Sequence, residues 1–347
     1  MLISFFCIVY EPIIYKYPLF ESIRSIIPIS DEIVMIFGKN EPVINELNKM
    51  SEKIRVVITE KWNYEWNYDV MTYHFDLGLR ESNGDFCVKF DIDYIFKYND
   101  INDLRNTLKN CSEYHKIYLP KYNYLDSNHW MVFSKGIYII NKSLLNKDSG
   151  DKTEQYFIGN KNYVNELISM IDLKTYTCSD NLVKVYNYDC TFMDYDTFYD
   201  KQLNWYRAYF SKWKKLDYFG LKEEDLYDKK RLVLFVINRT KDRILNAIQK
   251  NQIVFDNFKK NPYFIKEKLL KLDKNQYGKN FFGLIDIKNL LYEKIPKNNE
   301  IIDKNIKRIK NYLEKIDCSK EILENDKAIK YFIINTMKKD LLISKFS

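Results

Sequence analysis

Glycine is scarce in this sequence, with nine residues in 347, and histidine is scarcer still, with three. Glycine-rich loops cradle phosphate groups in many nucleotide-binding proteins, so a chain with so few glycines must hold any phosphate by other means. The six cysteines are scattered, with no CxxC pair and no histidines at zinc-ligand spacing. This pattern predicts free thiols in a reducing compartment, so we expect a cytoplasmic protein.

The sequence also lacks a long hydrophobic run at its start. The apolar segment MLISFFCIVY extends for about ten residues, has no basic stretch before it and meets Glu11 without a cleavage site of small residues. A membrane-spanning helix needs about 20 apolar residues. We therefore expect neither a signal peptide nor a transmembrane segment here, and we interpret the segment as a buried strand.

The chain is rich in aromatic residues and has an excess of positive charge toward its C-terminus. Aromatics make up 16% of the residues, and residues 241–347 hold 24 Lys and Arg against 14 Asp and Glu. Residues 1–240 are slightly acidic. They therefore lack the excess of basic residues that binds a polyanion, and nucleic acid is not expected as a partner. The length predicts a main domain over 1–240 and a basic, mainly helical region over 241–347.

Short apolar runs and amphipathic segments alternate over the first hundred residues. The order βαβαβαβ, with near-continuous apolar strands, indicates an α/β fold with a mainly parallel mixed sheet and helices on both faces, as in Rossmann-like proteins. Such sheets bind ligands beyond the carboxyl ends of their strands. The pattern becomes helical after Asp194. Strands are expected at residues 2–10, 32–37, 54–58, 86–92, 116–119, 130–141 and 183–188.

Two acids, Asp91 and Asp93, end the fourth expected strand in the segment GDFCVKFDIDYIF. Side chains at i and i+2 of an extended strand point the same way, so both carboxylates can reach a divalent cation from one side. An oxygen-only site of this kind suits Mg²⁺ or Mn²⁺ and leaves coordination positions for water and substrate phosphates. A lone DxD also fits a solvated turn; its place at the end of a parallel strand favours the metal site.

The segments DEIVMIF, HFDLGLRESNGDFCVKFDID and VYNYDCTF, in this order, resemble nucleotide-sugar-dependent glycosyltransferases of the GT-A fold, in particular the family 2-like group. That family has N-x-G-x-x-x-A-x-G-D before a hydrophobic strand and D-x-D, with Asp76 here in place of the frequent Asn. The resemblance is good over residues 1–95 and loose to about 215, which implies a nucleotide-sugar half at about 1–95 and an acceptor half at about 96–240. The matching positions of the approach segment are Asp76, Gly78, Ser82, Gly84 and Asp85.

The resemblance implies a hexosyltransferase-like, metal-dependent enzyme. It would move a sugar from a nucleoside-diphosphate sugar, with UDP as the favoured nucleotide, to a hydroxyl acceptor on a glycan or protein. By the same resemblance, Asp91 lies near the ribose or a metal-bound water, and Asp93 ligates the Mn²⁺ or Mg²⁺ that bridges the diphosphate. Tyr10, Glu11 and Lys39 would line the nucleoside pocket, although Tyr10-Glu11 departs from the family's Tyr-Asn or Phe-Asn.

Two further roles have candidates in the second half of the main domain. A third metal ligand is expected after a late strand, where VYNYDC offers Asn187 and Asp189; the carboxylate of Asp189 is the stronger ligand for a hard cation, and both residues also suit a simple turn. Inverting transfer needs a base near the acceptor hydroxyl. Asp126 is the first candidate, with Asp180 and Glu154 as alternatives, and a retaining enzyme would need none of them.

Two other function classes stay open from the sequence. A sugar-phosphate nucleotidyltransferase would also use a metal and an acidic pair, but it normally has a Gly- and Lys/Arg-rich loop after its first strand, and YEPIIYKYPLF has no glycine. A non-catalytic sugar-binding module could use the basic C-terminal region to reach a partner. Trp62 and Trp66, after the third strand, offer flat faces for a sugar ring, but a loop rich in Trp and Tyr more often packs on itself or binds a partner.

Overall fold

The computed structural model describes the chain in segments, all of which lie in one compact unit, Met1–Leu291. The predicted basic region beyond residue 240 is described only in part, so its helical character and its boundary stay predictions. The described residues are 1–59, 68–126, 129–149, 157–158, 166–167, 173–178, 182–189, 191–213, 223–250, 252–255, 265 and 268–269.

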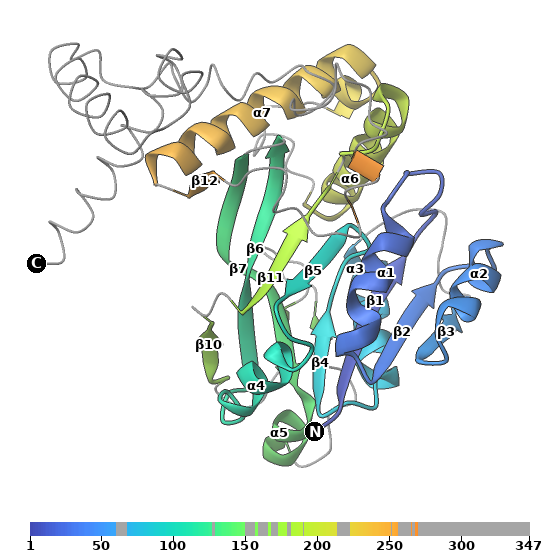
Figure 1. Ribbon diagram of the computed structural model, residues 1–347. Helices are drawn as coiled ribbons and strands as arrows, with labels where there is room; N and C mark the ends of the chain where they lie inside the picture. Colours follow the sequence, from blue (N-terminus) through green and yellow to red (C-terminus); the bar gives the residue numbers. More distant parts are fainter. Residues whose placement is uncertain are drawn as a thin grey trace, which may run out of the picture. The chain divides into compact units, whose positions relative to one another are not determined.

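Strands and helices alternate in the first half of the chain, as the sequence predicts (Figure 1). A short 3-10 helix, Ile27–Ile29, follows the first helix. The elements in chain order are β1 (Ile3–Val9), α1 (Leu19–Ile26), β2 (Glu32–Phe37), α2 (Val43–Met50), β3 (Ile54–Ile58), α3 (Tyr68–Glu81) and β4 (Phe86–Lys89).

The second half of the chain contributes further strands, several of them antiparallel, and then helices. The last long helix, α7 (Lys229–Gln249), is capped by Asp228, whose side chain accepts a hydrogen bond from the Arg231 backbone N–H. The elements are β5 (Tyr94–Tyr98), α4 (Asp103–Lys109), β6 (Lys116–Asp126), β7 (His129–Asn141), α5 (Lys142–Ser149), β8 (Phe157–Ile158), β9 (Glu166–Leu167), β10 (Thr175–Thr177), β11 (Val183–Asn187), α6 (Tyr195–Trp213), the 3-10 helix Glu223–Leu226, α7 (Lys229–Gln249) and β12 (Ile253–Phe255).

One mixed sheet organises these strands in the order β3-β2-β1-β4-β7-β6-β11-β5. The first four are parallel to one another, and β11 is parallel to β6. β7 runs antiparallel to both β4 and β6, and β5 runs antiparallel to β11. The mainly parallel mixed α/β sheet predicted from the sequence is therefore confirmed. Two expected boundaries were wrong: the strand predicted to reach residue 92 ends at Lys89, and the strand expected at 116–119 continues to Asp126.

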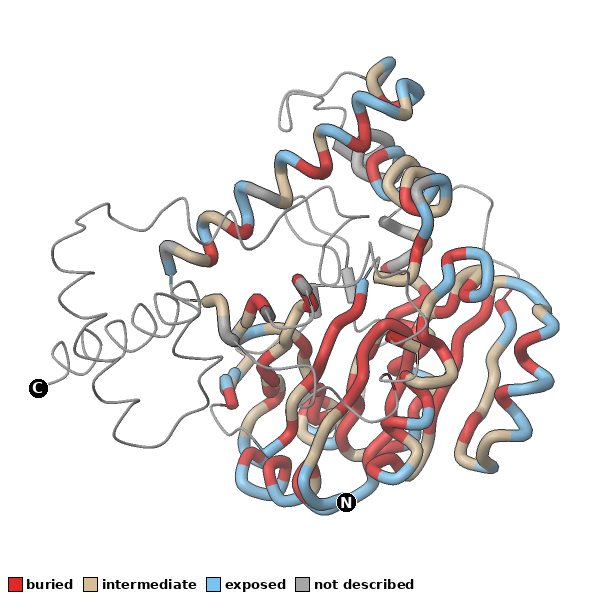
Figure 2. Tube along the Cα trace, turned by 45° about the horizontal axis from the view of Figure 1, so that its top comes forward, coloured by how far each residue is buried: buried red, intermediate tan, exposed pale blue. Residues whose placement is uncertain are grey.

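Helices cover both faces of the sheet because the side chains of β1 alternate between two cores. Phe5 and Cys7 join the core that α1, α2 and α4 cover, whereas Phe6 joins the core under α3 and α5. Figure 2 shows the buried residues, in red, running along the strands between these layers. The described cysteines Cys7, Cys87, Cys111 and Cys178 are buried and form no disulfide, as predicted.

A separate core joins α6 and α7 to the carboxyl end of β1. Tyr15, in the loop after β1, packs in one cluster with Phe198 of α6 and Leu232 of α7. The Tyr15 hydroxyl accepts a 2.9 Å hydrogen bond from Asn204 of α6. In Figure 1 these helices lie at the end of the sheet to which β1, β4 and β11 point. Within the described segments, no helix combines the length and the apolar character needed to cross a membrane.

Candidate functional site

The two acids of the DxD segment lie in a turn at the carboxyl end of β4. The backbone N–H of Tyr94 donates to the carbonyl of Asp91 at 2.9 Å, which closes the turn and starts β5. The two acids are therefore not on an extended strand, where side chains at i and i+2 point the same way. Asp91 is partly open to solvent, with 41% of its side chain exposed, whereas Asp93 is 7% exposed.

Asp91 is held by two neighbours. Lys89, the last residue of β4, places its Nζ 2.8 Å from Asp91 Oδ1. The Tyr94 hydroxyl also hydrogen-bonds to Asp91, and it accepts a 3.3 Å hydrogen bond from Lys121 Nζ of β6. A continuous path of polar contacts thus joins two lysines to this carboxylate.

Asp93 is the exceptional acid of the site. Its Oδ1 is buried and has no hydrogen-bond partner among the described residues. Burial, with a further contribution from the nearby carboxylates of Asp189 and Asp91, raises the pKa of Asp93 to about 7. An unsatisfied buried carboxylate oxygen costs free energy, and where a native structure keeps one, a missing cation or ligand is a natural explanation.

Asp189 reaches the same place from the end of β11. The backbone N–H of Tyr188 donates to the carbonyl of Asp93 at 3.0 Å, which ties the two segments together. Asn187 builds the local turn, because its Oδ1 accepts from the Asp189 N–H at 2.9 Å and its Nδ2 donates to Asn123 at 3.2 Å. The Asp189 carboxylate is half exposed and forms an ion pair with Lys201 of α6.

The residues predicted to line the nucleoside pocket also meet at this edge. Lys39, after β2, forms a 2.7 Å ion pair with Glu11, after β1. Glu11 has a positive φ of 41°, a conformation that non-glycine residues seldom adopt. Its backbone N–H donates to Glu41 at 3.3 Å. The structure brings these residues together, and their contact with a nucleoside stays a prediction.

A row of aromatic rings connects that group to the acids. The rings of Tyr10 and Tyr15 lie 6.1 Å apart, as do those of Tyr15 and Tyr17. Lys201, the ion-pair partner of Asp189, lies over the Tyr17 ring at 4.8 Å. A connected set of contacts at the carboxyl edge of the sheet therefore joins the predicted nucleoside residues to the predicted metal residues.

Oxygen ligands at this site fit a hard divalent cation. In the described part of the chain, no group of three or more His, Cys, Asp or Glu side chains gathers closely enough to hold a metal alone. A cation beside the orphaned Asp93 Oδ1 would thus take few protein ligands and complete its shell with water and phosphate oxygens. Mg²⁺ and Mn²⁺ sites in phosphate-binding enzymes have this composition.

Sequence reasoning missed Lys89, Tyr94, Lys121, Tyr17 and Lys201. Lys89 has a local signal, because it stands two residues before Asp91 in the strand. Lys121 and Lys201 are 30 and 110 residues from Asp91 in the sequence, and nothing in their own segments marks them as neighbours of the acids.

Several predicted residues are not placed by the structure. Asp126 ends β6 opposite His129 in the β6–β7 register, and its side chain lies outside the described residues. Glu154, Asp180, Trp62 and Trp66 fall wholly in segments that are not described. The identity of a base therefore stays a prediction.

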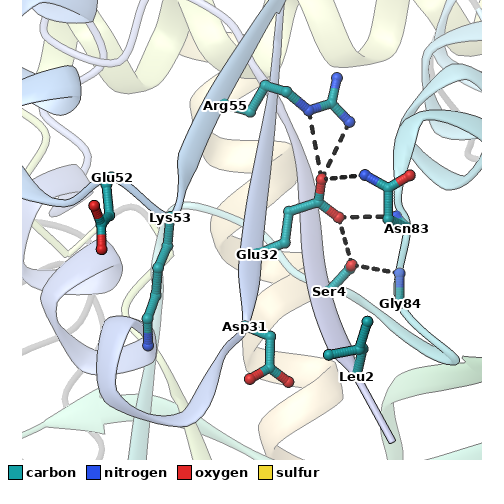
Figure 3. A pocket seen from close by; sticks show the side chains of 9 residues that line it. All are labelled: Leu2, Ser4, Asp31, Glu32, Glu52, Lys53, Arg55, Asn83 and Gly84. Atoms are coloured by element: carbon teal, nitrogen blue, oxygen red, sulfur yellow. Dashed lines mark hydrogen bonds and ion pairs between the residues drawn. The ribbon is translucent and has the colours of Figure 1, made fainter.

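A polar cavity of about 340 Å³ lies at the opposite edge of the sheet, at the amino ends of the parallel strands. Figure 3 shows that Glu32 fills its centre with contacts from three neighbouring segments. Its carboxylate accepts from Ser4 at 2.6 Å and from the Asn83 backbone at 2.8 Å, and it pairs with Arg55 at 3.3 Å. These contacts satisfy the carboxylate within the protein, so we interpret Glu32 as a structural clamp.

Replacing Glu32 with Gln should lower the free energy of unfolding by about 1–3 kcal/mol, the usual value for a charge-assisted network. Burial raises the pKa of Glu32. The hydrogen bonds from Asn83 and Ser4 and the charge of Arg55 lower it by more, so the pKa of Glu32 is lowered overall. The clamp's contribution is therefore complete above the unfolded-state pKa of about 4.3 and is lost as pH falls through the folded-state value. Urea denaturation at pH 7 and pH 3 measures both effects.

The matched control is Glu52→Gln, at an exposed acid that lines the same cavity. It should change stability by less than about 0.5 kcal/mol. Equal effects of the two substitutions would contradict the clamp.

Solved structures of other proteins are similar to this chain in fold. TarS of S. aureus, residues 1–349 in complex with UDP-GlcNAc, is 13% identical, covers 72% of this chain and 81% of its own, and gives a TM-score of 0.38. The mannosyltransferase PcManGT from Pyrobaculum calidifontis, in complex with GDP-Man and Mn²⁺, is 9% identical, covers 98% and 86%, and gives 0.39. No protein-family model and no curated protein matches the chain.

Proposed function

We propose that this protein is a glycosyltransferase that uses a divalent cation, Mn²⁺ or Mg²⁺, to transfer a sugar from a nucleoside-diphosphate sugar to a hydroxyl acceptor. The observation that carries the proposal is the buried Asp93 at the carboxyl edge of the sheet, with one carboxylate oxygen lacking a donor and two further acids nearby. Ligands of α/β sheets bind at this edge.

Asp93 and Asp189 are the residues we propose to hold the cation, with Asp91 beside them. A bound Mn²⁺ or Mg²⁺ neutralises the charge that develops on the departing nucleoside diphosphate. The protein's own contribution is to fix the acids before the substrate arrives. The Asn187 turn orients Asp189, and the contacts of Lys89 and Tyr94 orient Asp91.

The donor's nucleoside would lie over the surface between β1 and β2. Tyr10 offers an aromatic face, and the ion pair of Glu11 with Lys39 offers charged hydrogen-bonding groups at its rim. UDP is the nucleotide we favour. The acceptor would be a hydroxyl group of a glycan or protein, with Asp126 as the proposed base if transfer inverts the configuration.

Nucleotide binding that depends on the metal is the direct test. UDP or GDP at a hundred times its dissociation constant should stabilise the protein by about 2.7 kcal/mol, seen as a rise in melting temperature of several degrees. We expect this rise with Mn²⁺ or Mg²⁺ and only a small one in EDTA, because the diphosphate would then face the acids without a bridging cation. Differential scanning calorimetry of the full chain measures it.

Three outcomes would contradict the proposal. Equal stabilisation by the nucleotide with and without metal would remove the role of the cation. Release of pyrophosphate from a nucleoside triphosphate and a sugar phosphate, without hydrolysis of any nucleotide sugar, would favour a nucleotidyltransferase. Metal-independent binding of a glycan alone would favour a non-catalytic module.

A further inference from the structure

Three lysines accompany the three acids of the candidate site, each from a different part of the chain. Lys89 pairs with Asp91, and Lys201 pairs with Asp189. Lys121 approaches from β6 and forms no ion pair with a described carboxylate. Among the described residues, Lys121 donates one hydrogen bond, to the Tyr94 hydroxyl at 3.3 Å.

Lys121 has N–H donors left for a ligand. An ammonium group has three N–H donors, and one of those on Lys121 has a hydrogen-bond partner among the described residues, the Tyr94 hydroxyl, while the ammonium also lies 5.2 Å from the centre of the Tyr94 ring. Burial lowers the pKa of Lys121, while the charges of Asp91, Asp93 and Asp189 act to raise it. Lys121 is half-buried, and a lysine that has lost part of its contact with water is usually paired or used.

The backbone is shaped to bring Lys121 to this position. The β6–β7 register shifts between Leu119 and Lys121, where one residue of β6 opposes three of β7, so β7 bulges at residues 134–136. Gly136 lies in this bulge, and a Cβ added to it would lie 2.0 Å from Lys121 Cβ. Bulges are frequent next to active sites, where they change the local course of a strand. Gly136, one of the chain's nine glycines, thus allows β7 to approach Lys121 of β6 closely.

The net charge of the cluster is compatible with the binding of a metal together with a diphosphate. Asp91, Asp93 and Asp189 are balanced in number by the three lysines, so the protein alone is near neutrality here. A divalent cation and the two negative charges of a nucleotide-sugar diphosphate would also cancel each other. The metal alone cannot contact every phosphate oxygen, and a lysine acts as a compact point charge for phosphate.

We propose that Lys121 binds a phosphate oxygen of the donor's diphosphate, as a second positive group beside the cation. This assignment rests on the proposed function and adds to it a residue that the sequence pattern does not mark. It makes a distinctive prediction, because Lys121 should attract the nucleotide and repel the metal.

The test is Lys121→Met in the full chain, with two separate binding measurements. Affinity for UDP or GDP at saturating Mn²⁺, measured by calorimetry, should fall about tenfold or more, the loss of one charge-assisted hydrogen bond. Affinity for Mn²⁺ alone, measured by electron paramagnetic resonance, should stay equal or become tighter, because a cation next to the acids has been removed. A merely structural role would weaken both.

Two further variants serve as an alternative to Lys121→Met and as its control. Lys121→Gln, which can still donate to Tyr94, should lose nucleotide affinity as Lys121→Met does, and it replaces that variant if the latter folds poorly. Lys184→Met is the matched control. Lys184 precedes the residue that pairs with Lys121 across β6 and β11, so it lies on the opposite face, with its Nζ over the Tyr122 ring at 5.6 Å. It should leave both affinities within about twofold of the wild type, since surface changes are small in effect.

Unchanged nucleotide affinity in Lys121→Met would overturn the role of Lys121 while leaving the proposed function intact. Parallel losses of nucleotide and Mn²⁺ affinity would also overturn it, in favour of a structural role. If the wild type bound neither UDP nor GDP with Mn²⁺, the proposed function would fail, and this assignment with it.

Discussion

Asp93→Asn is expected to abolish sugar transfer and to make the folded protein more stable. Asp93 is 7% exposed, its Oδ1 has no donor among the described residues, and Asp189 and Asp91 add repulsion. An amide of the same shape removes that repulsion, so the free energy of unfolding should rise by about 1 kcal/mol, as often happens when a functional site is neutralised. The rate should fall at least about 10²–10³-fold, typical of losing a charged group that stabilises a transition state.

Both effects are measured on one preparation. Initial rates of metal-dependent UDP-sugar or GDP-sugar hydrolysis give the activity, and calorimetry without metal at pH 8 gives the stability. The absence of metal matters because a bound cation would itself stabilise the wild type.

Asp103→Asn is the matched control for this substitution. Asp103 is also 7% exposed, but its Oδ2 accepts from the backbone N–H groups of Asn99 at 2.8 Å and Asp100 at 2.9 Å. Removing that charge should lower the free energy of unfolding by about 1–2 kcal/mol and leave the rate unchanged. The interpretation of Asp93 as a functional acid is wrong if both substitutions destabilise the protein alike, or if Asp93→Asn keeps its activity.

The part of the fold that follows from local periodicity could be predicted from the sequence. Continuous apolar runs such as EIVMIF form the buried parallel strands, and the segments between them form helices on both faces. The position of the acids at the carboxyl edge follows from strand order along the chain. These features depend on neighbours within a few residues, where the chemistry of the side chains decides the structure.

Pairing between distant segments could not be predicted in the same way. The strand expected to reach residue 92 stops at Lys89, because the chain must turn at Asp91 to carry β5 to β11, at the far end of the sheet. That turn separates the exposures of Asp91 and Asp93, which an extended strand would have made alike. Lys121 meets the acids only through sheet order and a bulge, neither of which has a signal in its own segment.

Gly136→Ala is expected to produce the largest loss of stability that one added methyl group can cause near the site. The new Cβ would lie 2.0 Å from Lys121 Cβ, 2.6 Å from its backbone N and 2.8 Å from its Cα. Two of these three atoms belong to the backbone, so no side-chain rotation relieves the clash and β6 must move away from β7. Overpacking of this kind costs about 1–3 kcal/mol, and we expect the upper end. Urea denaturation measures the loss.

The clash also predicts a specific coupling between the two residues. Lys121→Gly removes the closest of the three atoms, so it should cost less stability in the Gly136→Ala background than in the wild type, by about 1 kcal/mol in a double-mutant cycle. Only partial rescue is expected, because the backbone contacts remain. A free energy of unfolding within about 0.5 kcal/mol of the wild type for Gly136→Ala would contradict the close approach. Additive effects of the two substitutions would mean that the cost of Gly136→Ala does not come from contact with Lys121. The bulge would then not be what positions Lys121 near the acids.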